Sequence, residues 1–228
     1  MCGRYSLVAG ADQLALRFDF DAGGLDLAPD YNVAPTQSVL TVRAADGPGD
    51  GRRHREAVLM RWGLIPSWAR DKSVGHRMIN ARAEAVAERP SYRTALQRRR
   101  CLVIADGFYE WQREGKARRP MRITLRSGEP FAFAGLWETW RDPEGERIQS
   151  CTIITTTPNS LVSAIHGRMP VILPPDLEDL WLDPDVKDSA ILSDILAPYP
   201  AEYMRAYEVS ALVNSPKNNV PDVIRRVD

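Results

Sequence analysis

The sequence predicts an α+β fold: a single domain, residues 1–228, around an antiparallel, barrel-like β-sheet with a few flanking helices. Two observations support this prediction. Six segments are rich in β-branched and aromatic residues and are typical of strands, whereas the helical segments are fewer and short. The length of 228 residues suits one large domain, which can bury a sizeable core without disulfides.

The expected strands lie at 31–44, 57–63, 101–111, 121–125, 131–140 and 151–157. Residues 126–129 separate two of these strands and predict a hairpin between them. The segment 43–56, RAADGPGDGRRHRE, is rich in glycine and polar residues and predicts a mobile loop between two strands.

Four helices are expected, at 12–18, 91–100, 177–182 and 189–196. Asp12 is the expected cap of the first helix. Ser91 occupies the cap position of the second helix, whose final turn is basic. The segment 214–228 is rich in Asn and Pro and predicts a C-terminal loop.

The composition restricts the partners and the compartment. The formal net charge is zero, which removes the argument that a basic domain binds nucleic acid. The excess of Arg over Lys suits a phosphate-binding groove, but a GC-rich genome is the preferred explanation of the excess itself. Cys2, Cys101 and Cys151 form neither a disulfide framework nor a zinc motif, so no metal and no cofactor is predicted. No signal peptide or membrane span is apparent, and we expect a cytoplasmic protein with reduced cysteines.

Cys2 is a candidate nucleophile because it follows the initiator Met1 directly. Removal of Met1 would leave an α-amine and a thiol on one residue, with ordinary pKa values of about 7.7–8.0 and about 8.5. The amine can form a Schiff base with an aldehyde, and the thiol can then close a thiazolidine ring. Taken alone, Cys2 is better explained as an ordinary small residue near a terminus, and only its context favours the nucleophile.

Three further segments carry polar residues that suit a reaction site. In MINARAEA, Asn80 and Arg82 share one face of an extended segment, so Asn80 can hold the Cys2 backbone or a sugar oxygen while Arg82 holds a phosphate. Glu110 follows a buried strand and lies between aromatic residues, and burial would raise its pKa. His166, between an apolar run and Gly-Arg, is the best candidate for proton transfer near neutral pH. Each residue taken alone is also compatible with a structural role.

Taken together, these segments resemble the SOS response-associated peptidase (SRAP) family of abasic-site processing proteins. The resemblance runs through MCGRYS, YNVAPTQ, MRWGLIPSWA, MINARAEA, CLVIADGFYEWQ, FAFAGLWE, TIITTTPN and IHGRMPVIL, about three quarters of the chain. It implies a SRAP-type domain that acts on abasic sites in single-stranded DNA. It also implies association with the nucleoid when the protein is bound to DNA. We expect a monomer, because the DNA must thread an open groove.

The resemblance also implies roles for individual residues. The family's catalytic residues correspond to Cys2, Asn80, Glu110 and His166. Its DNA-binding residues correspond to Arg4, Pro35, Trp68, Arg82, Trp111, Thr155 and Arg168.

Within these sets, Cys2 forms the thiazolidine crosslink, and Glu110 and His166 assist sugar ring opening and Schiff-base formation. His166 also assists reversal of the crosslink. The arginines grip phosphates, and Pro35 and Trp68 form a wedge that separates strands. Where some members carry two adjacent Trp, this chain has Ser67-Trp68, which puts the strength of the wedge in doubt.

Two alternatives remain open at this stage. An N-terminal-nucleophile peptidase or amidase would use Cys2 with a nearby base and would turn over amide substrates. A non-covalent single-stranded DNA binder would use arginines and the aromatic platforms Trp62, Trp68 and Trp111, although Trp62 is expected in the core. The family name implies autoproteolysis, which here would be removal of Met1 or self-release from DNA remnants.

Overall fold

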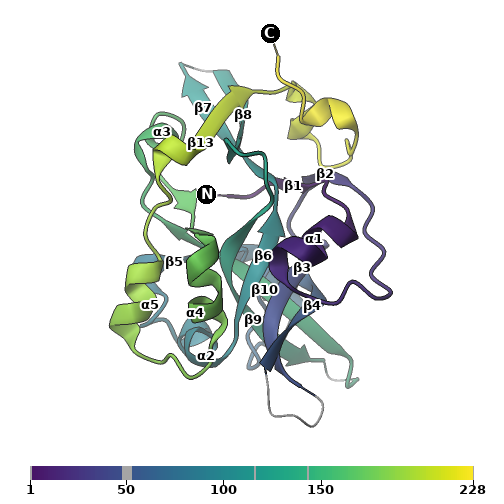
Figure 1. Ribbon diagram of the computed structural model, residues 1–228, viewed down its shortest axis with the longest axis vertical. Coiled ribbons are helices and arrows are strands. Elements are labelled where there is room, and N and C mark those ends of the chain that lie inside the picture. The colour runs from purple at the N-terminus through teal and green to yellow at the C-terminus, as the bar shows by residue number, and fades with distance from the viewer. Residues whose placement is uncertain (1, 48–52, 116, 143, 228) are drawn as a thin grey trace.

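The structure, a computed structural model, describes residues 2–47, 53–115, 117–142 and 144–227. Its strands form two sheets, and its helices lie around them (Figure 1). The α+β prediction is confirmed.

A closed five-stranded barrel forms the centre of the molecule. Its strands are β3 (Ser38–Asp46), β4 (Arg53–Trp62), β6 (Arg100–Ala105), β9 (Phe131–Arg141) and β10 (Arg147–Thr156). The ring runs β4-β3-β6-β9-β10, and β10 closes it by pairing with both β9 and β4. The β10–β4 pairing is parallel and the other four are antiparallel, so the barrel-like expectation is confirmed with one parallel seam.

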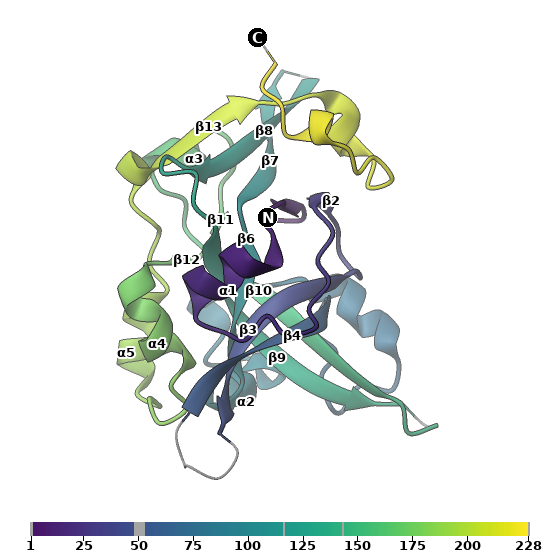
Figure 2. The same ribbon diagram turned by 45° about the vertical axis from the view of Figure 1, so that its right-hand side comes forward.

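A second, antiparallel sheet lies above the barrel in Figure 2. Its strands, in spatial order, are β13 (Met204–Glu208), β8 (Ala117–Leu125), β7 (Gly107–Glu114), β1 (Tyr5–Leu7) and β2 (Asp30–Val33). Three short strands extend the barrel sheet: β5 (Asn80–Arg82), β11 (Met169–Pro170) and β12 (Ile172–Leu173).

The helices are short. The α-helices are α1 (Ala11–Phe18), α2 (Pro90–Arg98), α3 (Ser160–Ser163), α4 (Glu178–Leu182) and α5 (Ser189–Ile195). The 3₁₀ helices are Lys72–Arg77, Ala83–Ala85, Pro175–Leu177, Ala201–Tyr203, Ala211–Asn214 and Pro221–Val223. Within the described ranges, none of these helices has the length and apolar character needed to cross a membrane.

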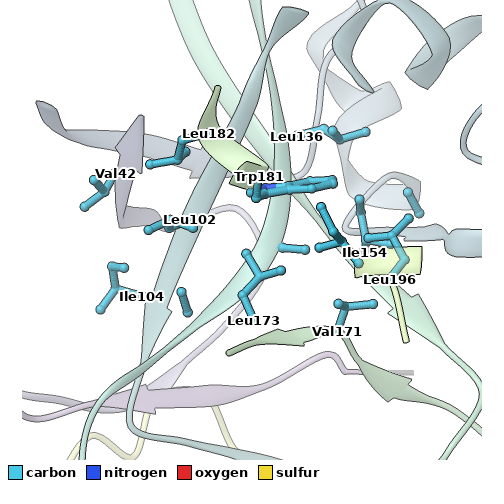
Figure 3. Packing of buried hydrophobic residues seen from close by; sticks show 14 of the residues in the cluster. Val42, Leu102, Ile104, Leu136, Ile154, Val171, Leu173, Trp181, Leu182 and Leu196 are labelled. Carbon is cyan, nitrogen blue, oxygen red and sulfur yellow. The ribbon is translucent and has the colours of Figure 1, made fainter. Parts of the chain in front are cut away.

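Alternation along the barrel strands divides the core into two clusters. On β6, Leu102 and Ile104 belong to an outer cluster that the helices cover, whereas Cys101 and Val103 belong to an inner cluster. Figure 3 shows the outer cluster, with Trp181 of α4 lying across it. The inner cluster is tightly filled: a Cβ on Gly135 would lie 2.8 Å from Val103 Cγ2, so only glycine fits there.

Two expected strands are each broken into two. The strand 31–44 becomes β2 and β3, because Thr36 adopts a φ of 77°, a left-handed conformation in which the chain turns. The strand 101–111 becomes β6 and β7, which belong to different sheets, because the chain leaves the barrel at Asp106.

The hairpin expected at 126–129 is wrong. The strands on either side, β8 and β9, belong to different sheets: β8 pairs with β7 and β13, and β9 pairs with β6, β10 and β12. The loop expected at 43–56 is wrong at both ends, where β3 and β4 pair in register from Ser38↔Arg61 to Asp46↔Arg53. Residues 48–52 of that prediction lie outside the described residues.

The helix predictions are confirmed in position, with corrections at their ends. Pro90, not Ser91, begins α2, since proline suits the first helical position, and Arg100 belongs to β6. Gly10 caps α1, and Asp12 lies in its first turn. In the predicted loop 214–228, the described part is largely irregular but contains the 3₁₀ helix Pro221–Val223.

Candidate functional site

Cys2 lies directly before β1, in the inner core cluster and close to where the two sheets meet (Figures 1 and 2). Its side chain is fully buried, and its Sγ lies 4.0 Å from the carbonyl oxygen of Arg4. Burial raises the pKa of the Cys2 thiol well above its ordinary value, and the negative charge of Glu110 raises it further. The thiol form is therefore strongly favoured in this environment.

Asn80 holds the backbone of Cys2. Its Nδ2 donates a hydrogen bond of 2.7 Å to the Cys2 carbonyl oxygen. Strand β5 positions it by pairing in parallel with β10, where Asn80 lies opposite Ile153 and Arg82 opposite Thr155. The buried Oδ1 of Asn80 accepts no hydrogen bond from the described residues, so it is available to a ligand.

Glu110 is the buried carboxyl of the site. It lies on β7, its side chain is 4% exposed, and its Oε1 lies 3.9 Å from Nδ1 of His166. Burial raises the pKa of Glu110, and the charge of His166 opposes that shift. A carboxyl whose pKa is raised by burial can act as an acid and a base.

His166 follows α3, which Asn159 caps by accepting a hydrogen bond of 2.9 Å from the Val162 backbone N–H. The backbone N–H of Arg168 donates to Nδ1 of His166 at 3.1 Å. The same Nδ1 lies 3.2 Å from the Arg168 carbonyl oxygen, so whether it accepts or donates depends on the tautomer of the ring.

The guanidinium of Arg168 is hydrogen-bonded to other side chains of the protein. Its two terminal nitrogens each lie 3.0 Å from a carboxylate oxygen of Glu84, and Nε donates to Thr155 Oγ1 at 3.3 Å. Thr155 is fully buried. Sequence reasoning missed Glu84, although it stands in the same MINARAEA motif as Asn80 and Arg82.

Arg4 and Trp111 are tied to the C-terminal segment. Arg4 donates to Asn32 Oδ1 and to the Val213 carbonyl, both at 2.8 Å, and burial lowers its pKa. Trp111 Nε1 donates to Asn214 Oδ1 at 2.7 Å. These contacts join residues about two hundred and one hundred positions apart, and no local pattern in the sequence could have indicated them.

Pro35 and Trp68 lie in two connections near the end of β4. The turn that contains Pro35 is joined to β4 by the hydrogen bond from Thr36 N to Trp62 O, at 2.8 Å. Trp68 is 65% exposed, as a stacking residue must be, whereas Trp62 is fully buried, as expected for a core residue. Arg82 is also exposed.

Two cavities adjoin these residues. One, of about 490 Å³, is lined by Glu110, Trp111, Arg113, Arg118, Ala164, Ile165, His166 and Gly167. The other, of about 330 Å³, is lined by Met78, Asn80, Arg82, Ala85, Arg89, Ser91 and Tyr92. The tertiary structure therefore groups Glu110 with His166 and Asn80 with Arg82. Cys2 is linked to both groups, because Asn80 donates a hydrogen bond to its carbonyl and the charge of Glu110 raises the pKa of its thiol.

Comparisons with other proteins show the family to which the chain belongs. The family model for SOS response associated peptidase (SRAP) matches residues 1–216. The chain is 49% identical to the abasic site processing protein YoqW of Bacillus subtilis, over 98% of this chain and 99% of that protein. It is 33% identical to the abasic site processing protein HMCES of Rattus norvegicus, over 88% of this chain and 65% of that protein.

A crystal structure of a Bacteroides thetaiotaomicron protein covers 99% of this chain and all of its own, with a TM-score of 0.88 and 30% identity. One from Bordetella bronchiseptica covers 92% of this chain and all of its own, with a TM-score of 0.76 and 27% identity. The chain belongs to the SOS response associated peptidase (SRAP) family.

Proposed function

We propose that this chain processes abasic sites in DNA by capturing the lesion covalently on Cys2, once Met1 has been removed. The names of its relatives support abasic-site processing. The observation that carries the covalent step is the grouping of a buried Cys2, held through its carbonyl by Asn80, with the buried carboxyl of Glu110 and with His166.

The reaction has two steps. The α-amine of Cys2 adds to the aldehyde carbon of the ring-opened abasic sugar, and loss of one water leaves an imine. The thiol then adds across the C=N bond: sulfur bonds to carbon, its proton passes to nitrogen, and a five-membered thiazolidine closes. No oxidant or further reactant is needed.

The pKa directions at the site suit this order. Because burial and Glu110 raise the pKa of the Cys2 thiol, a thiolate is not the form that attacks first. The amine attacks, and the thiol transfers its proton as the ring closes. A cysteine peptidase would instead use the thiolate as its initial nucleophile.

Glu110 and His166 move the protons. Glu110, whose pKa burial raises, can protonate the departing water oxygen and take up a proton from the attacking amine. His166, close to Glu110, assists opening of the sugar ring and reversal of the crosslink. The free Oδ1 of Asn80 accepts a hydrogen bond from the sugar or the amine.

The partner is single-stranded DNA, bound by a monomer. The residues proposed to bind the DNA are Arg4, Arg82, Trp111, Thr155 and Arg168. Pro35 and the exposed Trp68 act as a wedge where duplex meets single strand. Release of Met1 is the autopeptidase activity that the family name suggests.

Intact-protein mass spectrometry tests the proposal. The protein is incubated with single-stranded DNA that contains one abasic site. The expected product is the chain without Met1, joined to the DNA with loss of one water. Cys2→Ala gives no product. Absence of any adduct on protein that lacks Met1 would reject the proposal, and amide substrates would then be tested.

Cys2→Ser separates the imine from the thiazolidine. It keeps the amine but lacks sulfur, so its adduct stays an imine that requires borohydride reduction to survive heating. The wild-type adduct should survive heating without reduction. Equal heat stability of the two unreduced adducts would contradict the thiazolidine assignment.

A further inference from the structure

Two arginines lie opposite each other near the tip of the β7–β8 hairpin. Arg113 of β7 and Arg118 of β8 are directly paired in the antiparallel register. Side chains directly opposite on neighbouring strands are close neighbours, and like charges in this arrangement destabilise the sheet. Both side chains are exposed. The pair therefore costs stability unless an anion lies between the two guanidinium groups.

Two nearby acidic residues, Glu114 of β7 and Glu208 of β13, neutralise a different arginine. Arg119 donates to Glu114 at 2.5 Å and to Glu208 at 3.3 Å. Within residues 2–47, 53–115, 117–142 and 144–227, neither Arg113 nor Arg118 forms an ion pair or a side-chain hydrogen bond. Two positive charges on the hairpin therefore remain without an acidic partner in the part of the chain that is described.

The pair faces the reaction site. Arg113 and Arg118 line the same cavity of about 490 Å³ as Glu110 and His166. The hairpin is joined to the opposite wall by the hydrogen bond from Gln112 Nε2 to the Ala164 carbonyl, at 3.0 Å. A Cβ on Gly167, in that wall, would meet nothing within 4 Å, so the cavity is open beside it.

We propose that Arg113 and Arg118 form a phosphate clamp, which binds one phosphodiester of the DNA strand next to the abasic nucleotide. The assignment rests on the proposed function only in that the ligand is single-stranded DNA at this site. Guanidinium groups bind phosphate oxygens through charge-assisted hydrogen bonds and do so in pairs. One phosphate between them replaces the repulsion of the arginine pair with two attractions.

The test uses the full chain and a short single-stranded oligonucleotide that carries a tetrahydrofuran analogue of the abasic site. This analogue has no aldehyde, so binding is measured without covalent chemistry. The double variant R113Q/R118Q should bind about tenfold more weakly, which is the size of one charge-assisted hydrogen bond. The slope of log affinity against log salt concentration should fall by about 0.7, the value for one phosphate contact to a single strand.

R119Q is the matched control. It removes one positive charge from the same hairpin, against two in the double variant, at a residue bound to Glu114 and Glu208. Its affinity and salt slope should stay within twofold of wild type. Equal losses of affinity in R119Q and in R113Q/R118Q would overturn the clamp in favour of general charge attraction. No loss of affinity in either variant would show that the hairpin does not contact the DNA.

Shortened oligonucleotides locate the phosphate. With DNA that ends at the analogue on one side, the double variant should lose its defect; with DNA that ends on the other side, the defect should persist. An equal defect on both shortened strands would overturn a local clamp. The melting temperature of R113Q/R118Q should equal or exceed that of wild type, since a repulsion has been removed; a clear drop would show that the pair stabilises the fold instead.

The experiments can reject the phosphate clamp and the covalent capture independently of each other. If wild-type protein forms no adduct with abasic DNA but R113Q/R118Q still loses affinity for the analogue, the clamp stands and the covalent step is rejected. If wild type forms the adduct and the double variant binds the analogue as tightly as wild type, the clamp alone is rejected.

Discussion

Two buried carboxyl groups four residues apart, Asp106 and Glu110, have opposite surroundings. Asp106 accepts hydrogen bonds from Ser6 Oγ at 2.7 Å, from the Val8 backbone N–H at 2.5 Å and from the Arg122 guanidinium at 2.9 Å. Glu110 is more deeply buried, with a side chain 4% exposed against 12% for Asp106, and its ion-pair contact with His166 is longer, at 3.9 Å. Burial raises the pKa of Glu110.

The difference separates a structural carboxylate from a reactive one. A carboxylate that accepts hydrogen bonds from a guanidinium and two further donors fixes the strands around it. Gly107 makes this possible at Asp106, because a Cβ there would lie 2.8 Å from the Arg122 guanidinium. Glu110, which burial disposes to hold a proton, is suited to proton transfer beside Cys2.

The largest expected effect is on the free energy of unfolding, when Asp106 loses its arginine partner. Arg122→Met leaves a buried carboxylate without its cation, which typically costs about 3–5 kcal/mol. We expect a fall of that size in the free energy of unfolding, measured by urea denaturation. Adding Asp106→Asn should recover part of the loss, since the uncompensated charge is then gone. A loss below about 1 kcal/mol would place this pair among weak surface ion pairs.

The second effect is on the rate of adduct formation, when Glu110 is replaced. Glu110→Gln keeps the shape but cannot transfer a proton, so the initial rate of adduct formation should fall about a hundredfold, or about 2.7 kcal/mol in barrier. Gel analysis of adduct against time measures it. The free energy of unfolding should not fall. If Glu110→Gln forms the adduct at the wild-type rate, Glu110 is not the reactive carboxyl. If Glu110→Gln loses as much unfolding free energy as Arg122→Met, Glu110 is a structural carboxyl like Asp106.

The smallest effect is the pH dependence of stability. Because the pKa of Glu110 is higher in the folded than in the unfolded chain, the folded state holds more protons between the two pKa values. The free energy of unfolding therefore falls as pH rises through that window, by about 1.4 kcal/mol for each unit of pKa difference. Glu110→Gln should remove this fall in urea titrations at several pH values. Identical pH profiles for the two proteins would contradict the raised pKa.

Local patterns were sufficient to predict most elements but not their partners. Alternating apolar residues correctly located the barrel strands, because the two-residue period of a strand is a local property. The same pattern could not show that β8 pairs with β7 and not with β9, since the backbone hydrogen-bond ladder is nearly the same for any partner. The short strands β1, β11 and β13 were missed because two to five residues carry too little pattern.

For the site, too, the sequence was sufficient to predict the residues but not their contacts. The sequence by itself determined which side chains are present: the Cys2 aminothiol that follows from Met1 removal, and the amide, carboxyl and imidazole of Asn80, Glu110 and His166. Only the tertiary structure decided that Asn80 bonds the Cys2 carbonyl, that Glu84 occupies the fork of Arg168, and that Arg113 faces Arg118. The physical reason is that reactivity follows from residue type, whereas burial, charge pairing and pKa depend on contacts between residues far apart in the chain.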